Sequence, residues 1–216
     1  MEGETTMKIA IIGAGNVGGT LGKGWAKAGH DVAFGVRDAA DPKWKELLAA
    51  AGGRGKTATV RDAAAAAEVI ALTVPWDAAQ DALKSAGNLS GKILLDSTNP
   101  LKPDLSGLTH GSTTSGGEQV AAWAPGTRVV KIFNTTGFGN MANPKYAEGA
   151  SMMLYCGDDS AAKKVAAQLA GDLGFEPYDA GPLTEARLLE PLALAWIHLA
   201  VFQKMGTNFA FRLVKR

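Results

Sequence analysis

Residues 8–18 read KIAIIGAGNVG, an apolar run followed at once by three spaced glycines. The first five residues have the length and the β-branched content of a strand buried on both faces. The glycines Gly13, Gly15 and Gly18 match the spacing G-x-G-x-x-G, and the residues from about Asn16 to Ala28 are predicted to form a helix. The motif alone is weak in a chain with 27 glycines, so its place between a strand and a helix gives it weight.

Each glycine of this turn has a physical reason to be there. Gly13 permits the tight turn, Gly15 lets the backbone approach a pyrophosphate, and Gly18 lets the helix pack closely on the sheet. The helix N-terminus then presents free N–H groups and the positive end of its dipole to the phosphates. The predicted dinucleotide-binding segment is Gly13, Ala14, Gly15, Asn16, Val17 and Gly18.

Strand and helix patterns alternate through the rest of the chain, which predicts an α/β fold with a doubly wound, mostly parallel Rossmann sheet. We expect a Rossmann domain at residues 1–180 and a C-terminal helical extension at 181–216, packed on the same domain. The extension is predicted as a long helix interrupted at Pro191, plus a tail. Strands are expected at 8–12, 31–36, 57–59, 68–74, 92–95, 128–133, 151–156 and 176–178, with helices at 16–28, 42–51, 76–85 and 158–173, one opened by Asp62 and one ending near Trp123.

Composition bounds the class of protein. The 216 residues carry a net charge of +1 and no run of Lys and Arg, so neither nucleic acid nor an acidic membrane is an expected partner. The single cysteine, Cys156, excludes an intramolecular disulfide and is predicted to be a buried strand residue. The first residues lack the pattern of a signal peptide, and the apolar stretch 188–202 is short for a membrane span. We therefore expect a soluble, cytoplasmic protein.

The end of the second strand indicates which dinucleotide is bound. An NAD-preferring site usually carries Asp or Glu there, but this strand ends Phe34-Gly35-Val36-Arg37. A guanidinium can grip a 2′-phosphate through two charge-assisted hydrogen bonds. The sequence thus favours NADP(H), although Asp38 or Asp41 could instead pair with Arg37 at the surface.

Polar or rigid residues also follow three later strands, where an open parallel sheet binds its ligands. They lie in the segments 73–76, 96–100 and 133–137. Asn99 and Asn134 carry amides suited to the nicotinamide ribose or carboxamide. The same residues are also common in turns, so each one alone is ambiguous. The candidates for this half of the cofactor site are Thr73, Val74, Pro75, Asn99, Asn134 and Thr135, of which Pro75, Asn134 and Thr135 would lie closest to the nicotinamide.

No catalytic triad or metal cluster is visible in the sequence. His30, His110 and His198 are scattered, and each is interpreted as structural or exposed, although His110 lies in a long loop where it could approach a substrate. Hydride transfer needs no protein acid or base, because positioning of the nicotinamide against an acceptor supplies most of what is required.

Four segments together resemble the NADPH-dependent deazaflavin (coenzyme F-420) reductase family, which is related to the cytosolic domains of STEAP metalloreductases. The segments are 11–18, 72–76, 131–135 with 140–144, and 179–183 with 187–190. The resemblance implies NADPH along Gly13 to Gly18, with Arg37 on the 2′-phosphate. It also implies a flavin-like acceptor beside residues 134–138 and the segment from Pro182. One departure is Val36, where family members often place Ser.

Three functions follow as hypotheses. The first is hydride transfer between NADPH and a deazaflavin or flavin-like acceptor. The second is reduction of a small imine or carbonyl compound, for which only Thr135, Thr136 or His110 could serve as proton donor. The third is a non-catalytic NADP sensor. The terminal helix is expected to pack on the domain and, as a second use, to form a homodimer.

Overall fold

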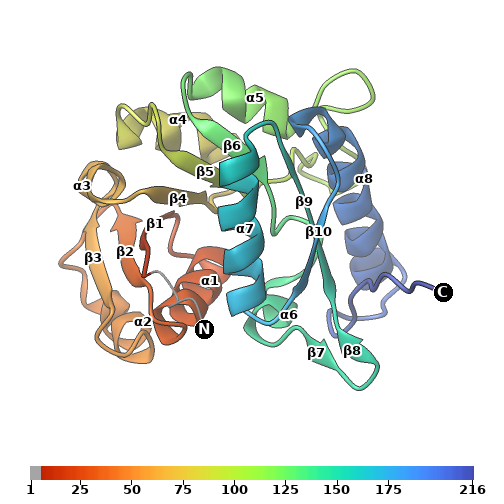
Figure 1. The fold of residues 1–216 in the computed structure, drawn as a ribbon, viewed down its shortest axis with the longest axis horizontal. Helices are drawn as coiled ribbons and strands as arrows, with labels where there is room; N and C mark the ends of the chain where they lie inside the picture. Colours follow the sequence, from red (N-terminus) through yellow and green to blue (C-terminus); the bar gives the residue numbers. More distant parts are fainter. Residues whose placement is uncertain (1–5) are drawn as a thin grey trace.

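The computed structural model describes residues 6–216 and contains an eight-stranded sheet with the order β10-β9-β6-β5-β4-β1-β2-β3 (Figure 1). A separate two-stranded hairpin is formed by β7 and β8. The strands are β1 (Lys8–Ile12), β2 (Asp31–Val36), β3 (Gly55–Thr59), β4 (Val69–Leu72), β5 (Ile93–Asp96), β6 (Arg128–Lys131), β7 (Lys145–Tyr146), β8 (Gly149–Ala150), β9 (Met152–Gly157) and β10 (Glu176–Asp179).

The first six strands of the sheet are all parallel, in the order 3-2-1-4-5-6 of a Rossmann fold. The order reverses at β1, whose Ile9 pairs with Val32 of β2 on one side and with Val69 of β4 on the other. Strand β9 runs antiparallel to β6, and β10 is parallel to β9. The predicted fold class, a doubly wound and mostly parallel sheet, is confirmed.

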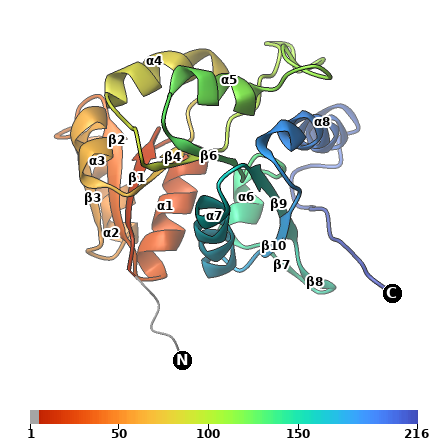
Figure 2. The same ribbon diagram turned by 45° about the horizontal axis from the view of Figure 1, so that its top comes forward.

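Helices cover both faces of the sheet, with α1 and α7 on one face and α3, α4 and α5 on the other (Figure 2). Each face buries its own apolar cluster against the strands. Helix α8 packs at the far end, against α5 and β9. The helices are α1 (Asn16–Lys27), α2 (Lys45–Ala50), α3 (Val60–Ala66), α4 (Trp76–Ala86), α5 (Gly116–Trp123), α6 (Phe138–Ala142), α7 (Ser160–Asp172) and α8 (Ala186–Ile197).

Local sequence explains why the central elements form. In β1 every residue after Lys8 is buried, as expected for a parallel strand covered on both faces. Helix α3 begins after Thr59, whose hydroxyl accepts the N–H of Asp62, and α7 begins after Asp159, which caps the N–H of Ala162. These caps fix where the chain leaves each strand and therefore where the strand ends lie.

The prediction that Pro191 interrupts the last helix is wrong. Helix α8 continues through Pro191 to Ile197, and residues His198–Phe202 then form a π-helical turn. Proline removes one helical hydrogen bond, but Pro191 is exposed, so water can satisfy the freed carbonyl. Buried apolar residues on both sides of it, such as Leu189 and Trp196, hold the helix against the domain.

Two further differences concern the region after β6. The strand ends at Lys131, two residues before Phe133, which has a left-handed φ of 63° and turns the chain sharply. The short helix α6 and the β7–β8 hairpin follow, and neither was predicted. Residues 133–150 show no regular apolar period, so the sequence pattern gave no signal for either element.

The C-terminal tail lies back on the domain. The ring of Phe209 stacks on Trp196 at 5.2 Å between centroids, and the Trp196 indole donates to the Phe209 carbonyl at 2.9 Å. The backbone N–H of Met152 donates to the Phe211 carbonyl. The C-terminal helical region is thus joined to the sheet through β9. Within residues 6–216, none of the helices has both the length and the apolar character that crossing a membrane requires.

Candidate active site

The glycine turn after β1 is shaped by close contacts. Gly13 has φ 103°, and a Cβ there would lie 2.7 Å from Val74 Cγ1. A Cβ on Gly18 would overlap the Gly13 carbonyl and the Thr73 hydroxyl, so α1 packs directly on the turn. Gly15 differs, because its Cβ would meet nothing within 4 Å. The turn therefore leaves open space only above Gly15, where a ligand can approach the backbone.

The N-terminus of α1 is free to bind an anion. Its N-cap, Gly15, supplies no side-chain hydrogen bond, and no acidic residue lies in the first turn. Gly15 and Asn16 are exposed. The first N–H groups of a helix have no partner inside the helix, and they carry the positive end of its dipole. This end of α1 is therefore suited to a phosphate group.

Thr73, which follows β4, is bonded to the end of the neighbouring strand β1. Its hydroxyl lies 2.7 Å from the Gly13 carbonyl oxygen and 3.0 Å from that of Ile12. This contact fixes the glycine turn, so the hydroxyl is used inside the protein. Val74 packs on Gly13, and Pro75 is the exposed N-cap of α4. The predicted segment thus does form one wall of the turn.

Arg37 stands at the edge of a cleft of about 600 Å³ next to the glycine turn. It is exposed, and no ion pair involves it within the described part of the chain. Asp38 accepts the backbone N–H of Ala40, and Asp41 caps and pairs with Lys43 at 2.7 Å. The sequence left open an ion pair between Arg37 and one of these two acids, and neither acid makes it. The guanidinium is therefore available to an anionic ligand.

Lys43 and Trp44 also line this cleft, and sequence reasoning did not identify them. The Trp44 indole donates to the Asp38 carbonyl at 2.9 Å, and the Lys43 ammonium lies 4.8 Å from the Trp44 ring centre. These contacts order the loop that carries Arg37. A Lys-Trp pair in a polar loop has no distinctive spacing, so only the structure reveals it.

The structure brings Asn99 and Asn134 together, although 35 positions separate them in the chain. The Asn99 amide donates to the Asn134 carbonyl at 2.9 Å, and the Asn134 amide donates to Asn99 Oδ1 at 3.0 Å and to the Leu189 carbonyl at 3.2 Å. We call Asn99 and Asn134 the amide pair. The left-handed backbone of Phe133 turns the chain just before Asn134. Asn134 Oδ1 is buried and has no partner within residues 6–216. It is an acceptor without a donor.

The other candidate side chains are buried or already in contact with other residues. Thr135 is buried, and Thr136 accepts a hydrogen bond from Asn140 at 2.8 Å. His110 packs edge-on against Trp76, with 5.2 Å between ring centres. His30 is buried and bonded to Asp172 at 2.9 Å, which agrees with a structural role.

Sequence reasoning also missed a group of buried charges beneath the amide pair. Lys131 is fully buried and lies between Asp96 and Glu190. Burial alone would lower the pKa of Lys131, but the two carboxylates outweigh it and raise the pKa above its ordinary value. A lysine between Val130 and Ile132 in an apolar strand was the available signal, because such a residue needs a buried partner.

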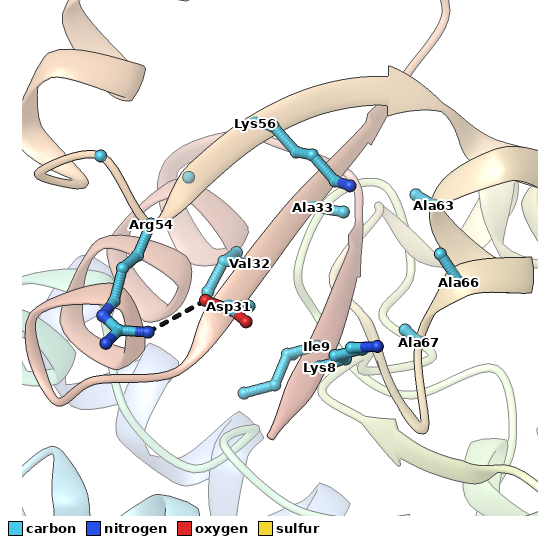
Figure 3. Close-up of a pocket in the computed structure, with 12 residues that line it drawn as sticks. Lys8, Ile9, Asp31, Val32, Ala33, Arg54, Lys56, Ala63, Ala66 and Ala67 are labelled. Atoms are coloured by element: carbon cyan, nitrogen blue, oxygen red, sulfur yellow. Dashed lines mark hydrogen bonds and ion pairs between the residues drawn. The ribbon is translucent and has the colours of Figure 1, made fainter. Parts of the chain in front are cut away.

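A second hollow, of about 280 Å³, lies at the opposite ends of the strands, where β1 and β2 begin (Figure 3). Lys8 and Asp31, the first residues of β1 and β2, line it, and Asp31 pairs with Arg54. Ligands of open parallel sheets bind beyond the carboxyl ends of the strands. The glycine turn, Arg37 and the amide pair all lie at those ends, so the candidate site is there.

Comparison with known proteins agrees with this geometry. The family model described as NADP oxidoreductase, coenzyme F-420-dependent, matches residues 8–100, which include the glycine turn, Arg37 and Asn99. The F-420-dependent NADP reductase of Methanothermobacter thermautotrophicus is 32% identical over 212 residues, covering 90% of each chain.

Two other relatives extend the comparison. A solved structure from Arthrobacter sp. FB24, assigned as an F-420-dependent NADP reductase, superposes with a TM-score of 0.86 at 34% identity, covering 97% of this chain and 100% of the other. Metalloreductase STEAP3 of Rattus norvegicus is 30% identical over 87% of this chain, which spans only 36% of that longer protein. The chain therefore belongs to the family of coenzyme F-420-dependent NADP oxidoreductases, as the resemblance in its sequence predicts.

Proposed function

We propose that this protein transfers hydride between NADPH and a deazaflavin or flavin-like acceptor. The observation that carries the proposal is that three features lie together at the carboxyl ends of the parallel strands. These are the N-terminus of α1 without a side-chain cap, Arg37 without an ion pair to any residue of 6–216, and the amide pair. They match the pyrophosphate, the 2′-phosphate and the nicotinamide end of one extended dinucleotide.

The residues fit NADP(H) in three respects. The space above Gly15 is open, Arg37 has no ion pair in the described part of the chain, and Asn134 Oδ1 is a buried acceptor that still needs a donor. In this proposal residues 13–18 bind the pyrophosphate, and Thr73 to Pro75 form the wall along the cofactor. The amide pair, together with Thr135, borders the nicotinamide. Bound NADPH supplies the hydride.

The chemistry around the amide pair favours a ring acceptor. Asp96 and Glu190 each pair with Lys131, and all three side chains are buried, so they are not free to exchange protons with a substrate. Reduction of a deazaflavin consumes one hydride and one proton, and the proton can come from solvent. The protein then needs only to hold the two rings in position, which by itself removes much of the barrier. The names of the relatives support the same acceptor class.

The decisive experiment mixes the protein with NADPH and either a deazaflavin or a flavin, without oxygen, and follows the nicotinamide absorbance. We expect turnover with at least one of these acceptors, and at least about a tenfold lower kcat in Asn134→Ala. Asn143→Ala is the matched control, because Asn143 is exposed and its side chain accepts only the N–H of Lys145 within residues 6–216. Absence of turnover with every acceptor of this class would refute the proposal.

Reduction of a small imine or carbonyl compound has less support. Such a reaction usually needs a proton donor next to the nicotinamide. Among the named candidates, Thr135 is buried, Thr136 is bonded to Asn140, and His110 packs on Trp76. A non-catalytic NADP sensor would bind NADPH and turn over none of the acceptors, so the same assay separates it.

We also propose that residues 1–180 hold the cofactor, and that the extension at 181–216 forms a homodimer interface. The outer face of α8 and of the π-helical turn after it supports this, because Leu188 and Phe202 are 65% and 47% exposed and the exposed Pro191 lies between them in the chain. Large exposed apolar side chains on one face of a protein favour association. Light scattering should give twice the mass of the chain, and Leu188→Glu should reduce it. A monomer at all concentrations would contradict the proposed dimer.

A further inference from the structure

Three charged side chains are buried together below the amide pair. Lys131 and Asp96 are 0% exposed, and Glu190 is 1% exposed. The Lys131 ammonium lies 2.9 Å from Asp96 Oδ2 and 2.8 Å from Glu190 Oε1, and it donates to the Thr98 carbonyl at 2.6 Å. We call Asp96, Lys131 and Glu190 the charged triad. Lysine has three N–H donors, and all three are used.

The remaining oxygens of the charged triad are also satisfied. Glu190 accepts the backbone N–H groups of Gly116 and Gly117, each at 2.9 Å, at the start of α5. Asp96 Oδ1 accepts both the N–H and the hydroxyl of Thr98. Two carboxylates thus face one ammonium and one helix N-terminus, so the charges are balanced. Because its pKa is raised, Lys131 stays protonated throughout the physiological range.

A buried charge network of this kind contributes little net stability to the fold. Removing charges from water costs several kcal/mol for each ion, and well-packed apolar residues of similar size are often as stable or more stable. What a fully bonded buried network does supply is a fixed geometry. Its position in the fold then indicates which geometry it fixes.

Each member of the charged triad lies next to a segment that builds the amide pair. Asp96 and Lys131 both bind Thr98, the residue before Asn99. Lys131 itself lies three residues before Asn134 in a buried, sharply turned segment. Glu190 follows Leu189, whose carbonyl accepts the Asn134 amide. The network therefore ties together the ends of β5 and β6 and one turn of α8, the three places where the amide pair is held.

We propose that the charged triad is a set of positioning residues, which holds Asn99 and Asn134 in the arrangement that orients the nicotinamide ring for hydride transfer. The proposal rests on the proposed function. It assigns no contact with the substrate to the triad. It predicts that disturbing the triad impairs hydride transfer while the adenosine half of the cofactor site, built by the glycine turn and Arg37, is unaffected.

The test compares Glu190→Gln with Glu118→Gln. Glu118 is the matched control, because it also links α5 to α8, through Arg187, but does not adjoin the amide pair. We expect Glu190→Gln to lower kcat roughly ten- to hundredfold, since small misplacements of the reacting groups have effects of this size. We expect the affinity for 2′,5′-ADP, which probes only the adenosine half, to stay within about twofold of wild type. The control should change neither quantity.

A merely structural role predicts different readouts. It would weaken 2′,5′-ADP binding and turnover together, and it would leave the isotope effect of NADPH deuterated at the transferred position unchanged. The proposal predicts a larger isotope effect in Glu190→Gln, because hydride transfer becomes more rate-limiting. An unchanged kcat in a folded Glu190→Gln protein would overturn it.

Two outcomes remain to be separated. If Glu190→Gln does not fold, Asp96→Asn carries the same test from the other end of the network. Failure of both variants to fold would assign the charged triad to stability and overturn the proposal. If wild-type protein binds neither 2′,5′-ADP nor NADPH, the proposed function has failed, whereas equal turnover by wild type and a folded variant refutes only the positioning role.

Discussion

Two substitutions in the glycine turn, Gly15→Ala and Gly18→Ala, are expected to have different effects, the first on ligand affinity and the second on stability. In Gly15→Ala the new Cβ meets nothing within 4 Å, and the backbone φ of −78° is allowed for any residue. The change of N-cap from Gly to Ala costs about 1 kcal/mol. The methyl group would, however, occupy the space where a phosphate approaches the helix N-terminus. Losing two charge-assisted hydrogen bonds there costs about 3 kcal/mol, or on the order of a hundredfold in Kd.

In Gly18→Ala the methyl group would overlap the Gly13 carbonyl and the Thr73 hydroxyl and would lie 2.7 Å from Ile11 Cγ2. We expect this variant to lose about 1–3 kcal/mol of unfolding free energy, or more. Urea denaturation measures stability, and calorimetric titration with NADPH measures affinity. If Gly15→Ala binds NADPH as wild type does, the phosphate does not lie at this turn and the reasoning fails.

Three further predictions concern stability and reactivity. Pro191→Ala should raise the unfolding free energy by about 1–3 kcal/mol in urea denaturation, because it restores the hydrogen bond to the Arg187 carbonyl in an exposed part of α8; a loss of stability would contradict this. Hydrogen bonds from Arg187 lower the pKa of Glu118, so its contribution of about 1 kcal/mol should be present above a pH of about 4.3 and be lost as the pH falls. Glu118→Gln should therefore flatten the acid side of the stability curve, and identical curves would refute the assignment. Burial raises the pKa of Cys156 to about 12, so a thiol reagent should label it only after denaturation, and rapid labelling of native protein would count against its burial.

The fold was predictable because its signals are local. The apolar run of β1, the glycine turn and the alternation of strands and helices each follow from residues close in sequence. The path of α8 through Pro191 was not predictable, since it depends on the packing of α8 and on the exposure of Pro191. Nor was the left-handed Phe133, because a buried aromatic residue gives no sequence signal for that conformation.

The candidate site was predictable where one residue type implies one chemistry. Arg37 at the end of β2 and the two asparagines after β5 and β6 belong to this class, and the structure does bring the asparagines together. Their binding roles stay predictions. The charged triad depends on three segments that meet only in the folded chain, with 94 positions between Asp96 and Glu190. Spacing in the sequence carries no trace of such a contact.

The most direct test of the whole account is a two-by-two calorimetric titration, with wild type and Arg37→Ala against NADPH and NADH. The two ligands differ only in the 2′-phosphate. Wild type should bind NADPH more tightly by about 2 kcal/mol, roughly thirtyfold, and Arg37→Ala should lose this preference while binding NADH as before. If folded wild-type protein binds neither nucleotide, or if the preference for NADPH survives without Arg37, the account is contradicted.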